Sequence, residues 1–370
     1  ARDLAKGVKG LQVWTLDRRE QAFMDLRVLG KGDPAESKAH YLGFKYRRVT
    51  GDRVPFVADW GLATSVNDIR RVVLKARAGG RRRVFLGGHS RGASTAAAYA
   101  AWDFKGRAGY RDLAGLFLID GGLLGAIAGK SVSQIPASAA RQQLGAIRGG
   151  KVFNDPLGTG IPELGPIFQQ VAAQYAAKQP GRTSALRSLA LLPPALKPAF
   201  PVTNEAFLGR NFDRQTSPPG FNALRVNSGR LARPGNPRRW VDGEITPIQT
   251  LARTFSRPRA TEWYFPQRLV LDIAAANPMR RDAVASSLGL RLWHTRRIDT
   301  PLYAYETELT HRAVSKGALR LVRRSRIEDY LVVTNTRLSH LDAVLAPRRT
   351  NAFTKSATKF LKKLIKRRSR

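Results

Sequence analysis

The hydrophobic pattern of this chain changes period along its length, which predicts strands that alternate with helices. Short apolar runs rich in β-branched and aromatic residues are typical of buried strands. They occur at Leu11–Leu16, Val84–Gly87, Leu113–Ile119, Pro301–Tyr305 and Asp329–Thr334. Helical spacing of apolar residues predicts helices at Ser65–Ala78, Ala93–Trp102, His311–Arg324 and Asn351–Ile365, and the last turns of another at Ala1–Val8. This alternation predicts the α/β class, with a mostly parallel sheet flanked by helices.

The alternation stops between Leu123 and Arg297. This stretch holds most of the prolines, polar loops and short helical patterns at Pro162–Ala177, Thr203–Arg214 and Trp263–Ala276. It is typical of a large, mainly helical cap inserted into a sheet domain. The predicted parts are a first core part at 1–122, a cap at 123–297 and a second core part at 298–370.

Two of the predicted helices have informative details. Ser65 is a plausible N-cap for the helix that it opens, because serine side chains accept hydrogen bonds from first-turn N–H groups. In the last helix one apolar stripe runs along one face, and lysines occupy the other faces. The stripe consists of Phe353, Ala357, Phe360, Leu361 and Leu364.

The composition excludes several classes of protein. With 370 residues, 43% of them hydrophobic, the chain can fill the core of one large domain with an insertion, or of two domains. The absence of cysteine excludes disulfides, cysteine-ligated zinc, iron–sulfur clusters and thiol nucleophiles. No window approaches 18 uninterrupted apolar residues, so no transmembrane helix is predicted.

The formal net charge of +37 suggests attraction to anionic partners. The 64 lysines and arginines are spread along the chain, and the densest runs are Arg81–Arg83, Arg323–Arg324 and the tail Lys362–Arg370. No zinc-finger spacing or RNA-binding signature accompanies them. We therefore interpret the charge as a solvated surface that attracts anionic surfaces, and not as a specific nucleic-acid site.

One short motif indicates chemistry. Gly88-His89-Ser90-Arg91-Gly92 matches Gly-x-Ser-x-Gly and lies between a predicted strand and an alanine-rich helix. That is the context of a nucleophile elbow, in which a strained turn exposes a serine above the sheet. The alternatives are a plain glycine-rich turn and a phosphate-binding loop.

A serine nucleophile needs a base, and the chain has five histidines. In a nucleophile-elbow fold the base follows the last strand, and His340 follows Asp329–Thr334 after a short polar loop. His340 is therefore the predicted base. Of the others, His311 is predicted to cap a helix, His89 to face away from the serine by strand alternation, His294 ends the insertion and His40 precedes the serine.

Three carboxylates remain open as the third member of a triad. Asp120 ends the strand after the nucleophile helix and is followed by two glycines, which allow a tight exit; this favours Asp120. Glu306 and Glu308 follow Pro301–Tyr305, another strand end where such an acid occurs. Asp120 could instead be an N-cap or an ion-pair partner.

These segments resemble the α/β-hydrolases of the bacterial serine esterase and lipase type, in particular a largely uncharacterised group of secreted enzymes. The resemblance rests on Val13–Arg19, Gly87–Ser90, Trp102–Phe104, Gly115–Gly122 and Ser339–Asp342, and loosely on Glu262–Pro266. It implies a triad of Ser90, His340 and Asp120 or Glu306, with ester substrates and no cofactor. No metal site is predicted. The family pattern also has a strand and a glycine-rich loop ahead of the helix at Ala1, so we expect the first central strand and one oxyanion donor to be lacking.

The expected function is hydrolysis of a small or polymeric carboxylic ester. Ser90 attacks the carbonyl, His340 takes the proton, and the backbone N–H of Arg91 stabilises the oxyanion. The cap is expected to hold an apolar acyl pocket, unless its aromatic residues form its own core; these are Phe168, Tyr175, Phe207, Phe212, Trp263, Tyr264 and Phe265. Alternatives are acyl transfer, amide or C–C hydrolysis on the same fold, or an impaired relative that binds polyanions or surfaces.

Overall fold

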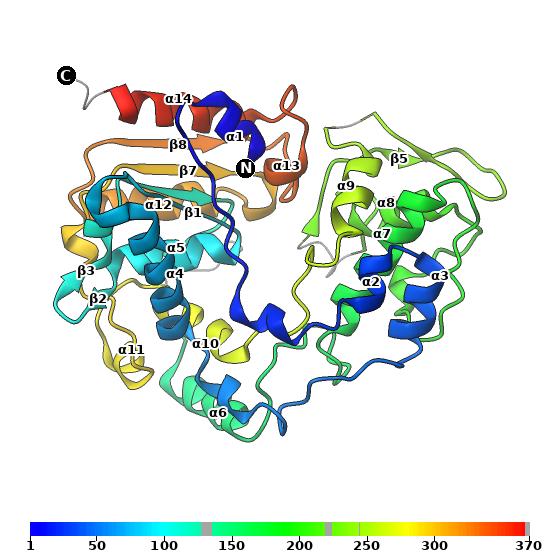
Figure 1. Cartoon of the computed structure of the whole chain (residues 1–370), viewed down its shortest axis with the longest axis horizontal. Coiled ribbons are helices and arrows are strands. Elements are labelled where there is room, and N and C mark those ends of the chain that lie inside the picture. Colours follow the sequence, from blue (N-terminus) through cyan, green and yellow to red (C-terminus); the bar gives the residue numbers. More distant parts are fainter. Residues whose placement is uncertain (127–134, 219–223, 244, 367–370) are drawn as a thin grey trace.

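The computed structural model of the chain describes residues 1–126, 135–218, 224–243 and 245–366. These residues form two lobes, one built around a parallel sheet and one mainly helical (Figure 1). Both ends of the described chain lie in the sheet lobe. Within the described residues, no helix combines the length and apolar character needed to cross a bilayer.

The central sheet has four parallel strands in the order β1-β4-β7-β8. Their bounds are Phe85–His89 for β1, Gly115–Ile119 for β4, Leu302–Glu306 for β7 and Tyr330–Thr334 for β8. His89 pairs with Ile119, and Ile119 pairs with Tyr305, so the carboxyl ends of three neighbouring strands are level. The predicted α/β class is therefore correct, and the loops that carry chemistry in such sheets leave from this edge.

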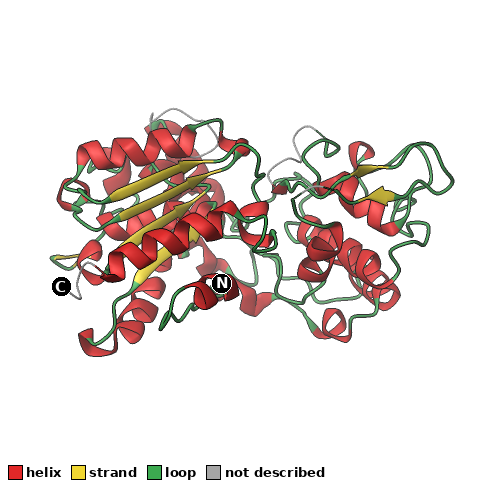
Figure 2. Cartoon of the chain, turned by 90° about the horizontal axis from the view of Figure 1, so that it is seen from above, coloured by secondary structure: helices red, strands yellow, loops and turns green. Residues whose placement is uncertain are grey.

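Helices cover both faces of the sheet (Figure 2). Phe117, Tyr303 and Tyr305 pack on one face against α14, and Leu116 and Leu118 pack on the other. This alternation follows from the twofold period of side chains along a strand. The first face is covered by α1 (Arg2–Gly7) and α14 (Ala352–Lys366), and the second by α4 (Leu62–Arg77), α5 (Arg91–Ala101) and α12 (Ala313–Arg324).

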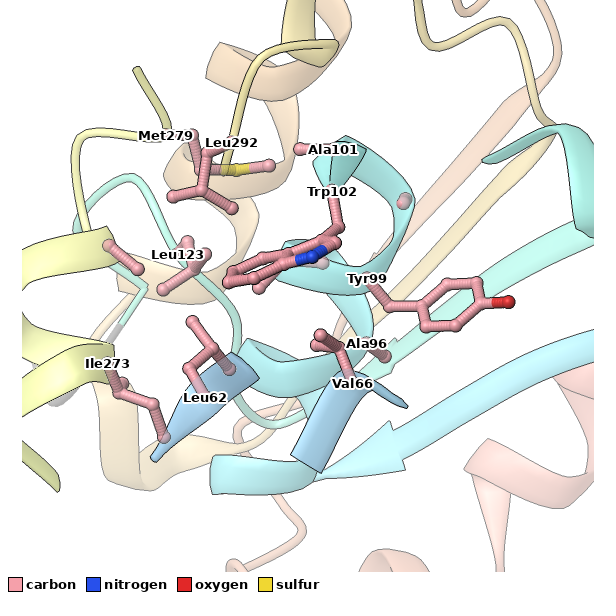
Figure 3. Packing of buried hydrophobic residues seen from close by; sticks show 14 of the residues in the cluster. Leu62, Val66, Ala96, Tyr99, Ala101, Trp102, Leu123, Ile273, Met279 and Leu292 are labelled. Atoms are coloured by element: carbon pink, nitrogen blue, oxygen red, sulfur yellow. The ribbon is translucent and has the colours of Figure 1, made fainter. Parts of the chain in front are cut away.

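Trp102 lies in the core on the second face, directly after α5, and is almost fully buried. Figure 3 shows its indole among the aliphatic side chains Leu62, Val66, Leu123, Ile273, Met279 and Leu292. Burial of an aromatic side chain of this size is a major contribution to stability. Ile273 comes from α10 (Gln267–Ala276), so this late segment packs in the sheet lobe.

The second lobe has its own apolar core. It combines α2 from the N-terminal part, with α3 packed beside the core on α7, and the helices α7, α8 and α9. The bounds are Arg27–Lys31, Pro34–Ser37, Leu164–Lys178, Asn204–Phe212 and Ile248–Phe255, with a two-stranded ribbon of β5 (Arg230–Leu231) and β6 (Trp240–Val241). The remaining elements are β2 (Asp103–Phe104), β3 (Arg107–Ala108), α6 (Ala137–Arg148), α11 (Ala283–Ser287) and α13 (Asp342–Leu345).

The domain boundaries predicted after residues 122 and 297 stay predictions. Each of the two apolar cores includes residues from both sides of a predicted boundary. Met24 to Tyr46 contribute to the core of the helical lobe, although they precede the predicted cap. Residues between Phe265 and Leu292 contribute to the core of the sheet lobe, although they lie inside the predicted cap.

Three local predictions are wrong. Leu11–Leu16 is not a strand; Val13, Trp14 and Leu16 are exposed, because β1 pairs only with β4 among the described strands and no partner strand receives this segment. Ser65 lies inside α4, whose N-cap is Gly61, and its hydroxyl donates to the Gly61 carbonyl. His311 does not cap α12, whose N-cap is Arg312; it is the C-cap residue of the short 3₁₀ helix Glu308–Thr310, where its N–H donates to the Glu308 carbonyl.

Candidate active site

Ser90 occupies a strained turn between β1 and α5. Its φ is 58° and its ψ is −125°, a conformation that a residue other than glycine rarely adopts. Its backbone N–H still donates to the Ile119 carbonyl at 2.9 Å, so the turn stays attached to the sheet. The helix begins at the next residue, and the Arg91 N–H is one of the first-turn groups without an acceptor inside the helix.

Two glycines make this tight turn possible. A Cβ on Gly88 would lie 2.1 Å from the Gly92 carbonyl group, so strand and helix can approach only because Gly88 has none. A Cβ on Gly121 would lie 2.1 Å from the Ser90 carbonyl oxygen. The second glycine of the motif, Gly92, has open space where its Cβ would be.

Asp120 and His340 lie together at the same edge of the sheet. Asp120 Oδ2 is 2.5 Å from His340 Nδ1, and both side chains are buried. Thr307, in the loop after β7, also binds this carboxylate: its N–H donates to Oδ1 at 2.8 Å and its hydroxyl to Oδ2 at 2.5 Å. Burial alone raises the pKa of the Asp120 carboxyl, but the hydrogen bonds and charge of His340 and the Thr307 hydrogen bonds outweigh it, so this pKa lies below its ordinary value.

The two alternative carboxylates lie elsewhere. Glu306 is fully buried and accepts hydrogen bonds from the N–H groups of Val314 and Ser315, so it caps the start of α12. Glu308 accepts from the Ser339 hydroxyl at 3.0 Å and forms an ion pair with Arg214 at 3.0 Å. Neither is the carboxylate that contacts His340 Nδ1.

His89 contacts the His340 loop, which sequence reasoning did not anticipate. The two rings lie 4.3 Å apart between centroids, and His89 Nε2 is 2.9 Å from the His340 carbonyl oxygen. Burial, together with the charge of His340, lowers the pKa of His89 to about 3. His89 is therefore neutral, and its Nε2–H donates to the main chain of His340 and fixes its position.

Asp342 stabilises the loop that carries His340. It is buried and accepts the N–H of Ser339 at 2.7 Å, the hydroxyl of Thr246 at 2.6 Å and the N–H of Asn227 at 3.2 Å. Burial raises the pKa of Asp342 to about 6. Because Thr246 and Asn227 belong to the long insertion, this carboxylate connects the His340 loop to the second lobe.

The side chain of Arg91 extends from the elbow toward the insertion. Its guanidinium carbon lies 4.4 Å from the centre of the Phe265 ring, and that of Arg18 lies 4.6 Å from the same ring. Arg18 in turn pairs with Glu262 through its Nε at 2.9 Å. These contacts, of the cation–π type, hold the N-terminal segment and the insertion against the elbow.

Two further histidines and the aromatic residues of the predicted cap have other partners. His294 and His40 pair with Asp103 and Asp25 respectively, away from Ser90. The aromatic residues considered for an acyl pocket are buried in the two cores; they are Phe168, Tyr175, Phe207, Phe212, Trp263, Tyr264 and Phe265. Among the described residues, no group of three His, Asp or Glu side chains is placed to hold a metal.

The Ser90 hydroxyl does not hydrogen-bond to the predicted base directly. Among the described residues no hydrogen bond joins Ser90 Oγ to His340, and His340 Nδ1 is already bonded to Asp120. In unliganded enzymes the bond between nucleophile and base is often long and shortens only when substrate binds. Ser90 adjoins His89, and His89 contacts both the ring and the carbonyl of His340, so both groups lie at one edge of the sheet.

No protein-family model matches this chain, and no curated protein or solved structure is significantly similar to it. A functional assignment therefore depends on the geometry of the site.

Proposed function

We propose that this protein is a serine hydrolase of the α/β-hydrolase type that cleaves carboxylic esters. One observation carries the proposal: a buried Asp120–His340 pair lies at the carboxyl edge of the sheet where Ser90 occupies a strained strand-to-helix turn. Each of these features has other uses, but the combination matches the order nucleophile, acid, base that hydrolases with a nucleophile elbow share.

In the proposed reaction Ser90 Oγ attacks the ester carbonyl and its proton passes to His340 Nε2. Asp120 holds the proton on Nδ1, which leaves Nε2 free to act as the base, and it stabilises the imidazolium that forms. The Arg91 N–H donates to the oxyanion. His340 then protonates the leaving alcohol, and the acyl group stays on Ser90.

The second half of the reaction repeats the first with water. His340 removes a proton from a water molecule, whose oxygen attacks the acyl carbonyl, and returns that proton to Ser90 Oγ when the carboxylic acid leaves. No residue has to change its position between the two halves. The buried Asp120, with its lowered pKa, stays ionised throughout.

The proposal is tested with a fluorophosphonate probe, which labels only activated serines, followed by mass-spectrometric location of the label. We expect a single label on Ser90, its loss in Ser90→Ala and a strong reduction in His340→Ala. Ser286→Ala is the matched control, because Ser286 is exposed on α11 away from this edge. Equal labelling of the Ser90→Ala variant and the wild type would show that Ser90 is not the nucleophile.

A further inference from the structure

The helix α14 presents a row of lysines to solvent. Lys355, Lys359, Lys362 and Lys366 are all exposed and recur every three or four residues, so they lie on one side of the helix. We call these four residues the lysine row. With a rise of about 1.5 Å per residue, the row extends over about 16 Å.

The opposite side of α14 explains why the row is fixed in place. Phe353, Phe360 and Leu364 are buried against the sheet, so the helix cannot rotate to redistribute its charges. Like charges three or four residues apart on a helix repel one another and destabilise it. The sequence of α14 contains no acidic residue to compensate for this cost.

Few acidic groups approach the row. Lys363, beside it, pairs with Asp329 at 2.6 Å, and the Lys355 ammonium donates to the Arg349 carbonyl. Lys359, Lys362 and Lys366 have no carboxylate partner among the described residues. Their charges are thus available to an external anion.

The surroundings of the row are basic. Lys363 and Thr358 border the row on the same helix. The short helix α1 packs beside it, with Gly7 against Thr358, and brings the exposed Lys6. Figure 1 shows α1 and α14 side by side.

We propose that the lysine row binds a linear polyanion that carries phosphate groups along its backbone. A straight row of point charges fits an extended chain of phosphates, and lysine binds phosphate as a point charge. None of the large apolar side chains exposed in the described chain lies on α14, which argues against insertion into a lipid surface. The row also offers no aromatic side chain for base stacking, so binding depends on phosphate alone and not on sequence.

The test measures binding of a short inorganic polyphosphate at several salt concentrations. The wild type is compared with the quadruple variant Lys355→Gln, Lys359→Gln, Lys362→Gln and Lys366→Gln. The slope of log affinity against log salt is about −0.7 for each phosphate neutralised on a flexible strand, so the variant should reduce the slope by about 3. If the quadruple variant fails to fold, two double variants replace it: one changes Lys355 and Lys359 to Gln, and the other changes Lys362 and Lys366 to Gln. Each double variant is expected to reduce the slope by about half as much.

The matched control removes the same charge from the other lobe. Arg230, Arg233, Arg239 and Arg253 are exposed there, and their change to Gln lowers the net charge equally. This control should keep the slope of the wild type, and an oligothymidylate should bind with a similar slope. Equal losses in both variants, no loss in either, or binding to phosphatidylserine vesicles in place of polyphosphate would each overturn the proposal. Binding is measured directly, so the result does not depend on the hydrolase proposal.

Discussion

Replacing Asp120 by Asn tests the geometry of the proposed triad most directly. The Thr307 N–H donates to Oδ1, so in the variant the amide oxygen is held at that position. The amide NH₂ then takes the place of Oδ2, 2.5 Å from His340 Nδ1. An NH₂ group forces Nδ1 to accept, which puts the ring proton on Nε2 and removes the base that Ser90 needs. We expect turnover to fall by up to about 10⁴-fold, or about 5.5 kcal/mol of transition-state stabilisation.

The assay is hydrolysis of a p-nitrophenyl ester, with thermal unfolding followed on the same samples. Glu306→Gln is the matched control, because it makes the same chemical change at the end of the neighbouring strand. In Glu306→Gln the new NH₂ faces the Ser315 N–H, so two donors meet and neither has an acceptor. We expect this to cost about 1–3 kcal/mol of folding stability and to leave the turnover of the folded protein unchanged. If Glu306→Gln abolishes turnover and Asp120→Asn does not, the role assigned to Asp120 is wrong.

The turn at Ser90, the carboxylate of Asp342 and the proposed triad can each be tested separately. Gly88→Ala should prevent folding or destabilise it by more than about 4 kcal/mol, whereas Gly92→Ala should have little effect on the melting temperature, since only the first Cβ meets backbone. The raised pKa of Asp342 means that the folded state binds its proton more tightly than the unfolded state. This group should therefore make the protein about 1 kcal/mol more stable at about pH 5 than at about pH 7, and chemical unfolding of Asp342→Asn should lack that increment. Ser90→Ala and His340→Ala should each cut ester turnover by about 10³-fold or more, and the double variant should be little worse; additive losses would contradict a joint role.

The sheet and the elbow could be predicted because their signals are local. The strand at Leu113–Ile119 is a continuous apolar run, and the structure has β4 at Gly115–Ile119. The elbow motif places its glycines where strand and helix meet, and Gly88 is indeed the point of closest approach. Each of these signals lies within a dozen residues, so one sequence is enough to detect it.

The supports of His340 could not be predicted because they come from distant parts of the chain. Thr307 is an unremarkable residue in a short loop, and only its hydrogen bonds to Asp120 give it a role. Strand alternation predicted that His89 faces away from the serine. It could not predict that the loop carrying His340 lies against the end of β1, where His89 contacts it. Asp342 had a weak signal, two residues after His340, but its partners Thr246 and Asn227 are about a hundred residues away.

The choice between Asp120 and Glu306 shows where sequence reasoning ends and packing begins. Ile119 pairs with Tyr305, so the two acids occupy equivalent positions on neighbouring parallel strands, and the register cannot separate them. They differ in the backbone that follows. Asp120 has a φ of 47°, in the left-handed region that Asp tolerates better than most residues, and it leaves the strand there. Glu306 remains part of β7, and the N–H groups at the start of α12 occupy its carboxylate. The acid that contacts His340 is thus the one whose strand ends one residue earlier, and the glycines after Asp120 were the only local sign of that exit.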